Sequence, residues 1–428
     1  DAGEDFEGAL ASITSALATA AKRLELGTLS TNQGEAVDAI ISDVRRLNRA
    51  GDTKGAMARL SEDAARRRAE RERRIAADSR VLDEAIAQAE LVNDAEAYAA
   101  FQLEKIQLGT PSAEEQFHQL RAIFIDRYQN GLRTGAPFLL TSAIDLARQC
   151  ESVAPTAYLK AMAKNDAGIA LQNQGTRTAG ARGSELLAQA VAAYDAALEI
   201  RTEQDRPVQW ATTQNNKGTA LRDQGIRTEG VRAAALLAEA VEAYDASLQV
   251  HTRTAHPLNW AMTQNNKGGA LEEQGIRTDG AWGTALLAKA VEAYDAALEI
   301  YTRRDHPVEW AITQNNKGNA LRYQGTLTEG APGAAILARA VAVYDAALEV
   351  RSRQHHPMRW AMTHLNLAMA KEAWARHDSA QDLRALLQEA LAHVDAALNV
   401  FDPEHMSYNH AKATRVRDRI RSKLDALS

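Results

Sequence analysis

Cysteine is almost absent from this sequence, because Cys150 is the only one among 428 residues. A single cysteine cannot form an intrachain disulfide, so a disulfide-stapled fold is excluded and a reducing compartment fits. Cys150 stands in an Ala- and Leu-rich stretch of helical character. We therefore expect a buried structural thiol rather than a reactive one.

Aromatic residues, prolines and long apolar runs are also scarce. Aromatics make up 5% of the chain and there are 9 prolines, while Ala, Leu, Glu and Arg are abundant, which favours helix over strand. No run approaches the roughly 20 apolar residues of a membrane span. The first ten residues, DAGEDFEGAL, lack the basic and then apolar pattern of a signal peptide. These features predict a helical, cytoplasmic protein with no membrane partner.

The charge balance and the missing motifs narrow the classes of function. The net charge is −6, which makes nucleic acid an unexpected partner, since such binders usually carry a basic domain. The chain has no GxxxxGK[ST], GxSxG, HExxH or CxxC pattern. Histidines such as His256 and His306 recur one repeat apart, about 10 Å or more, which is too far to converge on one ion. We expect no enzyme, no cofactor and no metal site.

The sequence repeats itself with a period of 50 residues. Tryptophans mark the period at Trp210, Trp260, Trp310 and Trp360. The first three are followed by nearly identical segments, WATTQNNKGTAL, WAMTQNNKGGAL and WAITQNNKGNAL, and the fourth by the diverged WAMTHLNLAMAK. An upstream copy, NDAGIAL, begins at Asn165. A fixed period of this kind is typical of a repeat array, here of five units from about 155 to 402. We expect the tryptophans to pack one repeat onto the previous one.

Each unit contains two helical patterns. The first is predicted to begin at a proline, which suits a first helical turn, at Pro207, Pro257, Pro307 and Pro357. We expect it to end at a glycine cap, at Gly225, Gly275 and Gly325. A polar connection such as IRTEGVR would follow, with a second glycine at Gly230. In the second helix Leu237, Val241, Tyr244 and Leu248 recur on one helical face.

These residues resemble the tetratricopeptide repeat family. Gly218, Gly268 and Gly318 match the small residue of its first helix, and Ala240, Tyr244 and Ser247 match the small–aromatic–small pattern of its second. The usual unit of the family has 34 residues, so we expect ten extra residues here, largely in the GIRTEGVR connection. The sequence is most similar to the longer bacterial and kinesin-light-chain-like variant, with lysine at Lys217, Lys267 and Lys317 where that variant has leucine. The resemblance implies an all-α, right-handed α-solenoid of stacked antiparallel helix pairs.

Three regions follow from the pattern. Residues 1–150 form a helical N-terminal region, either degenerate repeats or an oligomerisation element, with helices at about 54–92, 94–108, 113–130 and 137–150. Residues 151–404 form the five repeats. Residues 405–428 form a capping helix, with Val416, Ile420 and Leu424 on one face. We interpret the arginine-rich run at 66–74 as a solvated helix face with internal ion pairs rather than a binding patch.

The best candidate site is a ladder of paired asparagines, Asn215 and Asn216, Asn265 and Asn266, and Asn315 and Asn316. The resemblance implies that first helices line a concave groove, where Asn216, Asn266 and Asn316 would contact the backbone of an extended peptide. An amide can both donate and accept, so it can pair with a peptide unit of any sequence. The alternative is that the amides only bridge adjacent repeats. Specificity would come from neighbours that differ between repeats, Arg222, Glu272, Arg322 and Tyr323.

The leading hypothesis is a scaffold that binds a protein or peptide in the groove. A second is a regulatory or sensor arm of a larger effector, whose enzyme domain lies outside this sequence. A third is a small-molecule or nucleic-acid binder using Lys217, Lys267 and Lys317 together with Arg227 and Arg277. Self-association is a further expectation. The repeated aspartates Asp195, Asp245, Asp295 and Asp345 are expected to bond locally or to face solvent, because they lie too far apart to act as an acid–base pair.

Overall fold

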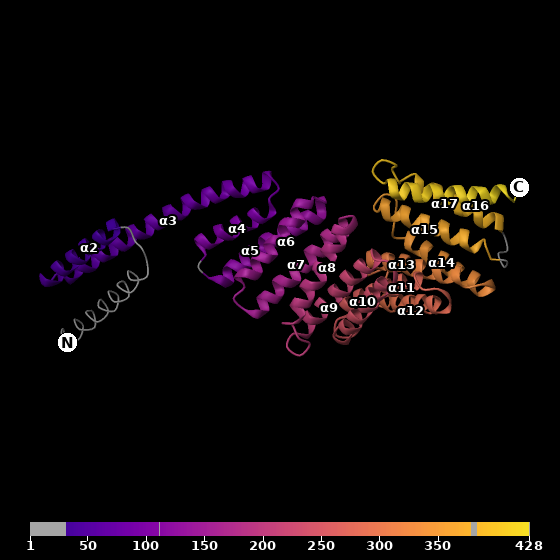
Figure 1. The fold of residues 1–428 in the computed structure, drawn as a ribbon, viewed down its shortest axis with the longest axis horizontal. Helices are drawn as coiled ribbons and strands as arrows, with labels where there is room; N and C mark the ends of the chain where they lie inside the picture. The colour runs from indigo at the N-terminus through magenta and orange to yellow at the C-terminus, as the bar shows by residue number, and fades with distance from the viewer. Residues whose placement is uncertain (1–30, 111, 378–382, 428) are drawn as a thin grey trace. The chain divides into compact units, whose positions relative to one another are not determined.

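The computed structural model describes residues 31–110, 112–377 and 383–427, with side chains described from residue 37 onward. Every regular element in these ranges is a helix, and consecutive helices pack in antiparallel pairs, so the expected all-α solenoid is confirmed (Figure 1). The parts of the predicted N-terminal region at residues 1–30, and of the capping segment at Ser428, lie outside the described residues. The chain divides into two compact units, one ending at Ala85 and the other beginning at Ile86.

The first unit contains a helical hairpin. It consists of α2 (Thr31–Arg49) and most of α3 (Thr53–Leu91), which continues across the boundary into the second unit. Gly51, with φ 77°, makes the turn, and the Asp52 carboxylate caps α3 by accepting from the Gly55 amide at 2.8 Å. Ile40 and Val44 of α2 are buried together with Ala56 of α3. A short apolar seam therefore holds the hairpin together.

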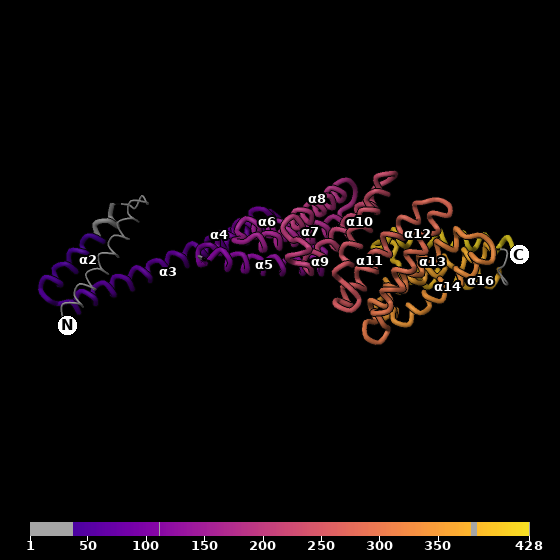
Figure 2. The backbone as a smooth tube through the Cα atoms, turned by 90° about the horizontal axis from the view of Figure 1, so that it is seen from below, coloured from indigo at the N-terminus to yellow at the C-terminus, as the bar shows by residue number. Residues whose placement is uncertain are grey.

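The second unit is a stack of helix pairs that follow one another in chain order, as Figure 2 also shows. Its N-terminal helices are α4 (Ala95–Gly109), α5 (Ala113–Thr134) and α6 (Pro137–Val153). The repeats that follow comprise α7 (Ala157–Arg177), α8 (Gly180–Leu198), α9 (Pro207–Ile226), α10 (Gly230–Val250), α11 (Pro257–Ile276), α12 (Gly280–Leu298), α13 (Pro307–Leu327), α14 (Gly330–Leu348), α15 (Pro357–Trp374) and α16 (Leu383–Leu398). The last helix is α17 (Ser407–Asp425).

The helices of the stack form two layers with different spacing. Cα atoms of each first helix approach the first helix of the next repeat within 8 Å, along the series α7, α9, α11, α13 and α15. No such approach occurs among the second helices α8, α10, α12 and α14, all of which are fully described. The first helices are therefore the more closely spaced layer. We call this layer of first helices the inner layer.

The predicted connection between the helices of a repeat is wrong. Gly225 lies inside α9, which ends at Ile226, and only residues 227–229 separate it from α10. A Cβ atom on Gly225 would lie 2.9 Å from Leu237 Cγ, so this glycine permits a close helix approach rather than capping a helix. The left-handed residue is Gly230, with φ 65°, which begins α10. The extra length relative to a 34-residue unit therefore lengthens the helices.

A buried tyrosine fills the space between the two helices in the first four repeats, and Val394 stands at the equivalent position of the fifth. Tyr244 is fully buried, and a Cβ atom on Gly218 of the paired helix would lie 2.9 Å from its ring. The same arrangement occurs at Tyr194, Tyr294 and Tyr344 with Gly168, Gly268 and Gly318. A glycine is therefore needed at the position predicted for the small residue of the first helix, because the tyrosine ring occupies the space that a Cβ atom would take.

Packing between repeats follows the predicted roles of the tryptophans and of Cys150. Trp260 and Trp310 pack against a cluster of buried residues that includes Ala297 and Tyr301. Cys150 is buried in the core, and desolvation raises the pKa of its thiol to about 12. A thiol with so high a pKa carries little thiolate at neutral pH, which supports the structural interpretation.

The C-terminal part of the stack is closed by α17. Val416 and Ile420 are buried against α15 and α16, as the amphipathic pattern predicts. Glu372 of α15 accepts hydrogen bonds from Arg419 and Lys423 of α17 at 2.5 to 2.6 Å. These ion pairs lower the pKa of Glu372 to about 2 despite its burial.

One described helix, α14, has the length and apolar composition of a membrane span. In the stack α14 occupies the same second-helix position as α8, α10 and α12, between α13 and α15. Its Leu337 and Tyr344 are buried there. The apolar character of α14 has a structural role in the repeat core.

Candidate partner-binding face

The paired asparagines form a continuous ladder across the inner layer of first helices. The second asparagine of each pair donates from Nδ2 to the Oδ1 atom of an asparagine in the preceding repeat. The donor–acceptor distances are 3.5 Å for Asn216 to Asn165, 3.1 Å for Asn266 to Asn215, 3.3 Å for Asn316 to Asn265 and 3.4 Å for Asn366 to Asn315. The first asparagine of each pair thus bridges adjacent repeats.

A threonine that sequence reasoning missed strengthens the ladder. The hydroxyls of Thr213, Thr313 and Thr363 lie 3.3, 3.2 and 3.1 Å from the Oδ1 atom of the asparagine in the preceding repeat. Each hydroxyl shares its single hydrogen with a carbonyl oxygen one turn earlier on its own helix, at 2.8 to 2.9 Å. These threonines are almost fully buried. The signal was present in the repeated segment WAxTQNNKG, in which the threonine stands three positions before the second asparagine. On one helix this spacing brings both side chains to the same flank.

The asparagines of two pairs differ in what remains available to a ligand. Asn215 and Asn315 are buried while Asn216 and Asn316 are partly buried, and in the pair between them Asn265 and Asn266 are both partly buried. No described group donates to the amide oxygens of Asn266 and Asn316, and one N–H of each amide is used in the ladder. Each of these side chains therefore keeps an acceptor and a second donor for another molecule.

Exposed apolar side chains accompany these asparagines. Leu258 and Met262 lie two turns and one turn before Asn266 on the same face of α11, and they are 50% and 37% exposed. Val308 on α13 is 39% exposed and Met362 on α15 is 47% exposed. Residues four apart on a helix lie side by side. We call Leu258, Met262, Asn266, Val308, Asn316 and Met362 the inner strip, because they recur at equivalent positions along one face of the first helices.

Arg222, Glu272 and Arg322 lie on the flank between repeats rather than on the open strip. The Nε atoms of Arg222 and Arg322 are enclosed and have no hydrogen-bond partner. Arg222 donates to Asp223 at 2.9 Å. Glu272 accepts from the hydroxyl of buried Tyr294 at 2.8 Å. These three groups therefore contribute first to contacts within the stack.

The charges on this flank alternate along the stack. Burial raises the pKa of Glu272 to about 7, an effect that Tyr294 and the positive charges of Arg322 and Arg222 oppose. Arg322 lies over the ring of Tyr323, with its guanidinium carbon 4.0 Å from the ring centroid. Tyr323 is half-buried and belongs to the same helix, so this cation–π contact fixes a planar apolar surface beside the strip.

The repeated lysines and aspartates pair with one another across repeats. Lys217 contacts Asp195 at 2.6 Å, and Lys267 and Lys317 contact Asp245 and Asp295 at 2.5 Å each. These aspartates were expected to bond locally or to face solvent: their side chains are 48 to 50% exposed, and their lysine partners stand 22 positions later on the next first helix. With their charges matched in this way, the lysines form no unbalanced basic stripe.

No protein-family model matches the chain, and no curated protein matches it. The fold is therefore established by the helices and their packing, and the tetratricopeptide resemblance stays a prediction from the repeated residues.

Proposed function

We propose that this protein is an interaction scaffold that binds a peptide or an extended segment of a partner protein along the inner strip. The observation that carries the proposal is the combination of exposed Leu258, Met262 and Met362 with half-exposed asparagines on one face of consecutive repeats. Exposed apolar side chains that are grouped and flanked by polar groups are typical of interaction sites.

The chemistry of the strip suits an extended chain. The free acceptor and donor of Asn266 and Asn316 can pair with peptide groups without reading their side chains. Methionine is flexible and polarisable, so Met262 and Met362 can adapt to different apolar side chains. Together these groups would give backbone affinity with broad side-chain tolerance, as in repeat proteins that resemble the tetratricopeptide family.

The paired lysines favour this function over nucleic-acid binding. Lys217, Lys267 and Lys317 each lie against an aspartate, and the net charge of the chain is −6. Phosphate binding would require these pairs to break and would show a steep dependence on salt concentration. A groove that uses apolar contacts and amide hydrogen bonds would depend little on salt.

The test is a peptide-display selection against the wild-type protein, followed by affinity measurements on variants. Leu258→Ser combined with Met262→Ser and Met362→Ser removes the apolar part of the strip. Because each buried apolar side chain contributes roughly 1.5–3 kcal/mol, we expect the affinity of selected peptides to fall by at least tenfold. Asn266→Ala combined with Asn316→Ala is expected to weaken binding as well.

A matched control uses exposed apolar residues elsewhere, Val231→Ser and Trp282→Ser, which are 88% and 69% exposed on second helices. These variants should bind the selected peptides as the wild type does. Circular dichroism verifies that every variant keeps its helix content. Unchanged affinity in the triple serine variant, or an equal loss in the control, would refute the inner strip as the binding face.

A further inference from the structure

Three arginines clamp successive repeats together in the same way. Arg227 donates to the carbonyl oxygens of Thr178 and Thr176, both at 2.5 Å. Arg277 donates to Thr228 and Ile226, both at 2.8 Å. Arg177 likewise donates to Gly131 and Leu132 at 3.0 and 3.2 Å.

The carbonyl groups that accept these bonds lie at the C-terminal ends of first helices. The last carbonyl groups of a helix have no partner within it, and the end of the helix carries partial negative charge. A guanidinium satisfies two of them at once because its N–H donors point in a fixed fork. The pair of carbonyl oxygens at the end of a first helix thus forms a notch that accepts a guanidinium, and an arginine of the chain itself occupies this notch at three junctions.

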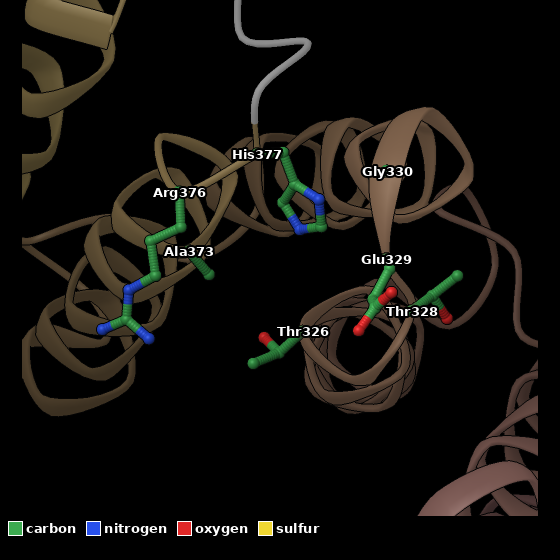
Figure 3. Close-up of a pocket in the computed structure, with 7 residues that line it drawn as sticks. All are labelled: Thr326, Thr328, Glu329, Gly330, Ala373, Arg376 and His377. Carbon is green, nitrogen blue, oxygen red and sulfur yellow. The ribbon is translucent and has the colours of Figure 1, made fainter.

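At a later junction the notch has no arginine. His377 stands where Arg227 stands three repeats earlier, and no described side chain donates to the carbonyl oxygens of Thr326 and Thr328. The imidazole covers part of the notch, since a Cβ atom on Gly333 would lie 2.6 Å from its Cε1 atom. A hollow of about 620 Å³ remains beside it, lined by Thr326, Thr328, Glu329, Gly330, Ala373, Arg376 and His377 (Figure 3).

Negative charge gathers at one side of the hollow. Figure 3 shows the Glu329 carboxylate beside Thr326 and Thr328, at the end of α13. Arg376 lies at the opposite side of the hollow, with its guanidinium 3.4 Å from Glu372, a carboxylate that also accepts hydrogen bonds from Arg419 and Lys423. The negative end of α13 and the Glu329 carboxylate therefore face the open space together.

We infer that this notch binds the arginine side chain of a partner protein beside His377, whose imidazole fills part of the space that an arginine such as Arg227 takes at the other junctions. The inference rests on the proposed scaffold function and adds a recognition element to it. The guanidinium would donate to the Thr326 and Thr328 carbonyl oxygens and pair with Glu329. Lysine fits less well, because a single ammonium does not match two carbonyl groups with a planar fork.

The preceding junction supplies a control. Leu327 occupies the register position of the arginine there, and the carbonyl oxygens of Ile276 and Thr278 have no described side-chain donor. Leu327→Arg would build a clamp at that junction and leave the hollow beside Thr328 open. His377→Arg would instead fill the hollow with an internal guanidinium.

The experiment titrates methylguanidinium into the full chain carrying ¹³C-labelled threonine methyl groups. We expect saturable shifts at Thr326 and Thr328, with a Kd on the order of 10 mM for so small a probe. Methylammonium, of equal charge, should bind at least threefold more weakly. His377→Arg should abolish the shifts and raise the unfolding temperature, whereas Leu327→Arg should leave the shifts unchanged. Glu329→Gln should weaken binding at least threefold.

The outcomes separate this inference from the scaffold function. Absence of saturable shifts in the wild type, equal shifts in His377→Arg, or equal binding of methylammonium would each overturn the arginine notch. The serine variants of Leu258 and Met262 should bind methylguanidinium as the wild type does, because they leave the notch intact. Failure of the peptide selection with normal methylguanidinium binding would count against the scaffold alone.

Discussion

Two adjacent glycines in α11 should respond in opposite ways to the same substitution. A Cβ atom on Gly268 would lie 2.7, 2.9 and 3.0 Å from three ring atoms of Tyr294, which is buried. On Gly269 the nearest atom would be Nη1 of Arg222 at 3.3 Å, the end of a flexible side chain. The tyrosine ring has no room to retreat, whereas the arginine can shift by a few tenths of an ångström.

The magnitudes follow from two opposing effects. Alanine is about 1 kcal/mol better than glycine inside a helix, and overpacking a core costs about 1–3 kcal/mol. Because three atoms of a fixed ring are involved, Gly268→Ala should lower the free energy of unfolding by about 1–2 kcal/mol. Gly269→Ala should raise it by up to about 1 kcal/mol. The sign of the difference is therefore predicted as well as its size.

The assay is urea unfolding monitored by circular dichroism, with hydrogen exchange of the α11 and α12 amides as a local readout. Repeat arrays can depart from two-state unfolding, so the two variants are compared with each other under identical conditions. Tyr294→Leu provides the decisive background, because it removes the ring that crowds Gly268. In that background Gly268→Ala should cease to be destabilising. Equal stability of the two single variants, or destabilisation by Gly268→Ala that persists in the leucine background, would refute the steric explanation.

Three further predictions concern charges in the stack. Burial raises the pKa of Glu272 from 4.5 to about 7, so between these values the folded protein retains a proton that the unfolded chain has lost, and stability should fall as pH rises through this window. Glu272→Gln should flatten the pH profile of the unfolding temperature, and parallel profiles of the variant and the wild type would contradict this. Lys317→Met breaks the pair with half-exposed Asp295, so it should cost less than about 1 kcal/mol and less still at high salt; a larger, salt-independent loss in urea unfolding would be inconsistent. Arg351 is buried with no carboxylate partner, donates to Thr363 at 2.7 Å, and has a pKa lowered to about 10 by desolvation. Arg351→Met should therefore raise the unfolding temperature, and a clear decrease would show that the hydrogen bond to Thr363 contributes more than the buried charge costs.

The repeat and its helices could be predicted because one physical constraint recurs every 50 residues. The prolines at Pro257 and Pro307 begin helices as expected, and Gly218 lies where a tyrosine needs space. The helices expected at 54–92 and 94–108 appear as α3 and α4 with bounds shifted by one residue. Local rules suffice for such features, because each depends on the chemistry of one helix.

The misplaced connection shows where local rules fail. Gly225 and Gly230 both look like helix-terminating glycines in sequence, and propensity cannot tell a cap from a close approach. The difference lies in Leu237, which packs onto Gly225 from the neighbouring helix. Without the tertiary contact, the polar segment between the two glycines was assigned to a loop, although most of the expected extra length extends the helices.

The candidate site was predicted in part for a similar reason. The asparagine pairs stand out because they repeat, and their division into a buried Asn215 and a half-exposed Asn266 follows from which flank faces the next repeat. The apolar strip was missed because Met262 and Leu258 are not identical between repeats, and an apolar residue on a helix is ordinarily assigned to the core. Whether such an apolar side chain is exposed depends on how the repeats stack, and no local pattern in the sequence shows this.

The flank residues explain why the repeats, though similar, are not interchangeable. Successive repeats place Arg222, Glu272 and Arg322 at one register position, and Glu372 follows. Glu272 is influenced by both neighbouring arginines, and their positive charges favour its ionised form against the cost of burial. Exchanging the repeats that carry Glu272 and Arg322 would place Arg222 and Arg322 in adjacent positions, in surroundings where their Nε atoms already lack partners. Like charges brought together cost free energy, so the alternation makes the present arrangement of charges more favourable than the exchanged one. These variable residues therefore stabilise contacts between neighbouring repeats, in addition to any contact that they make with a partner.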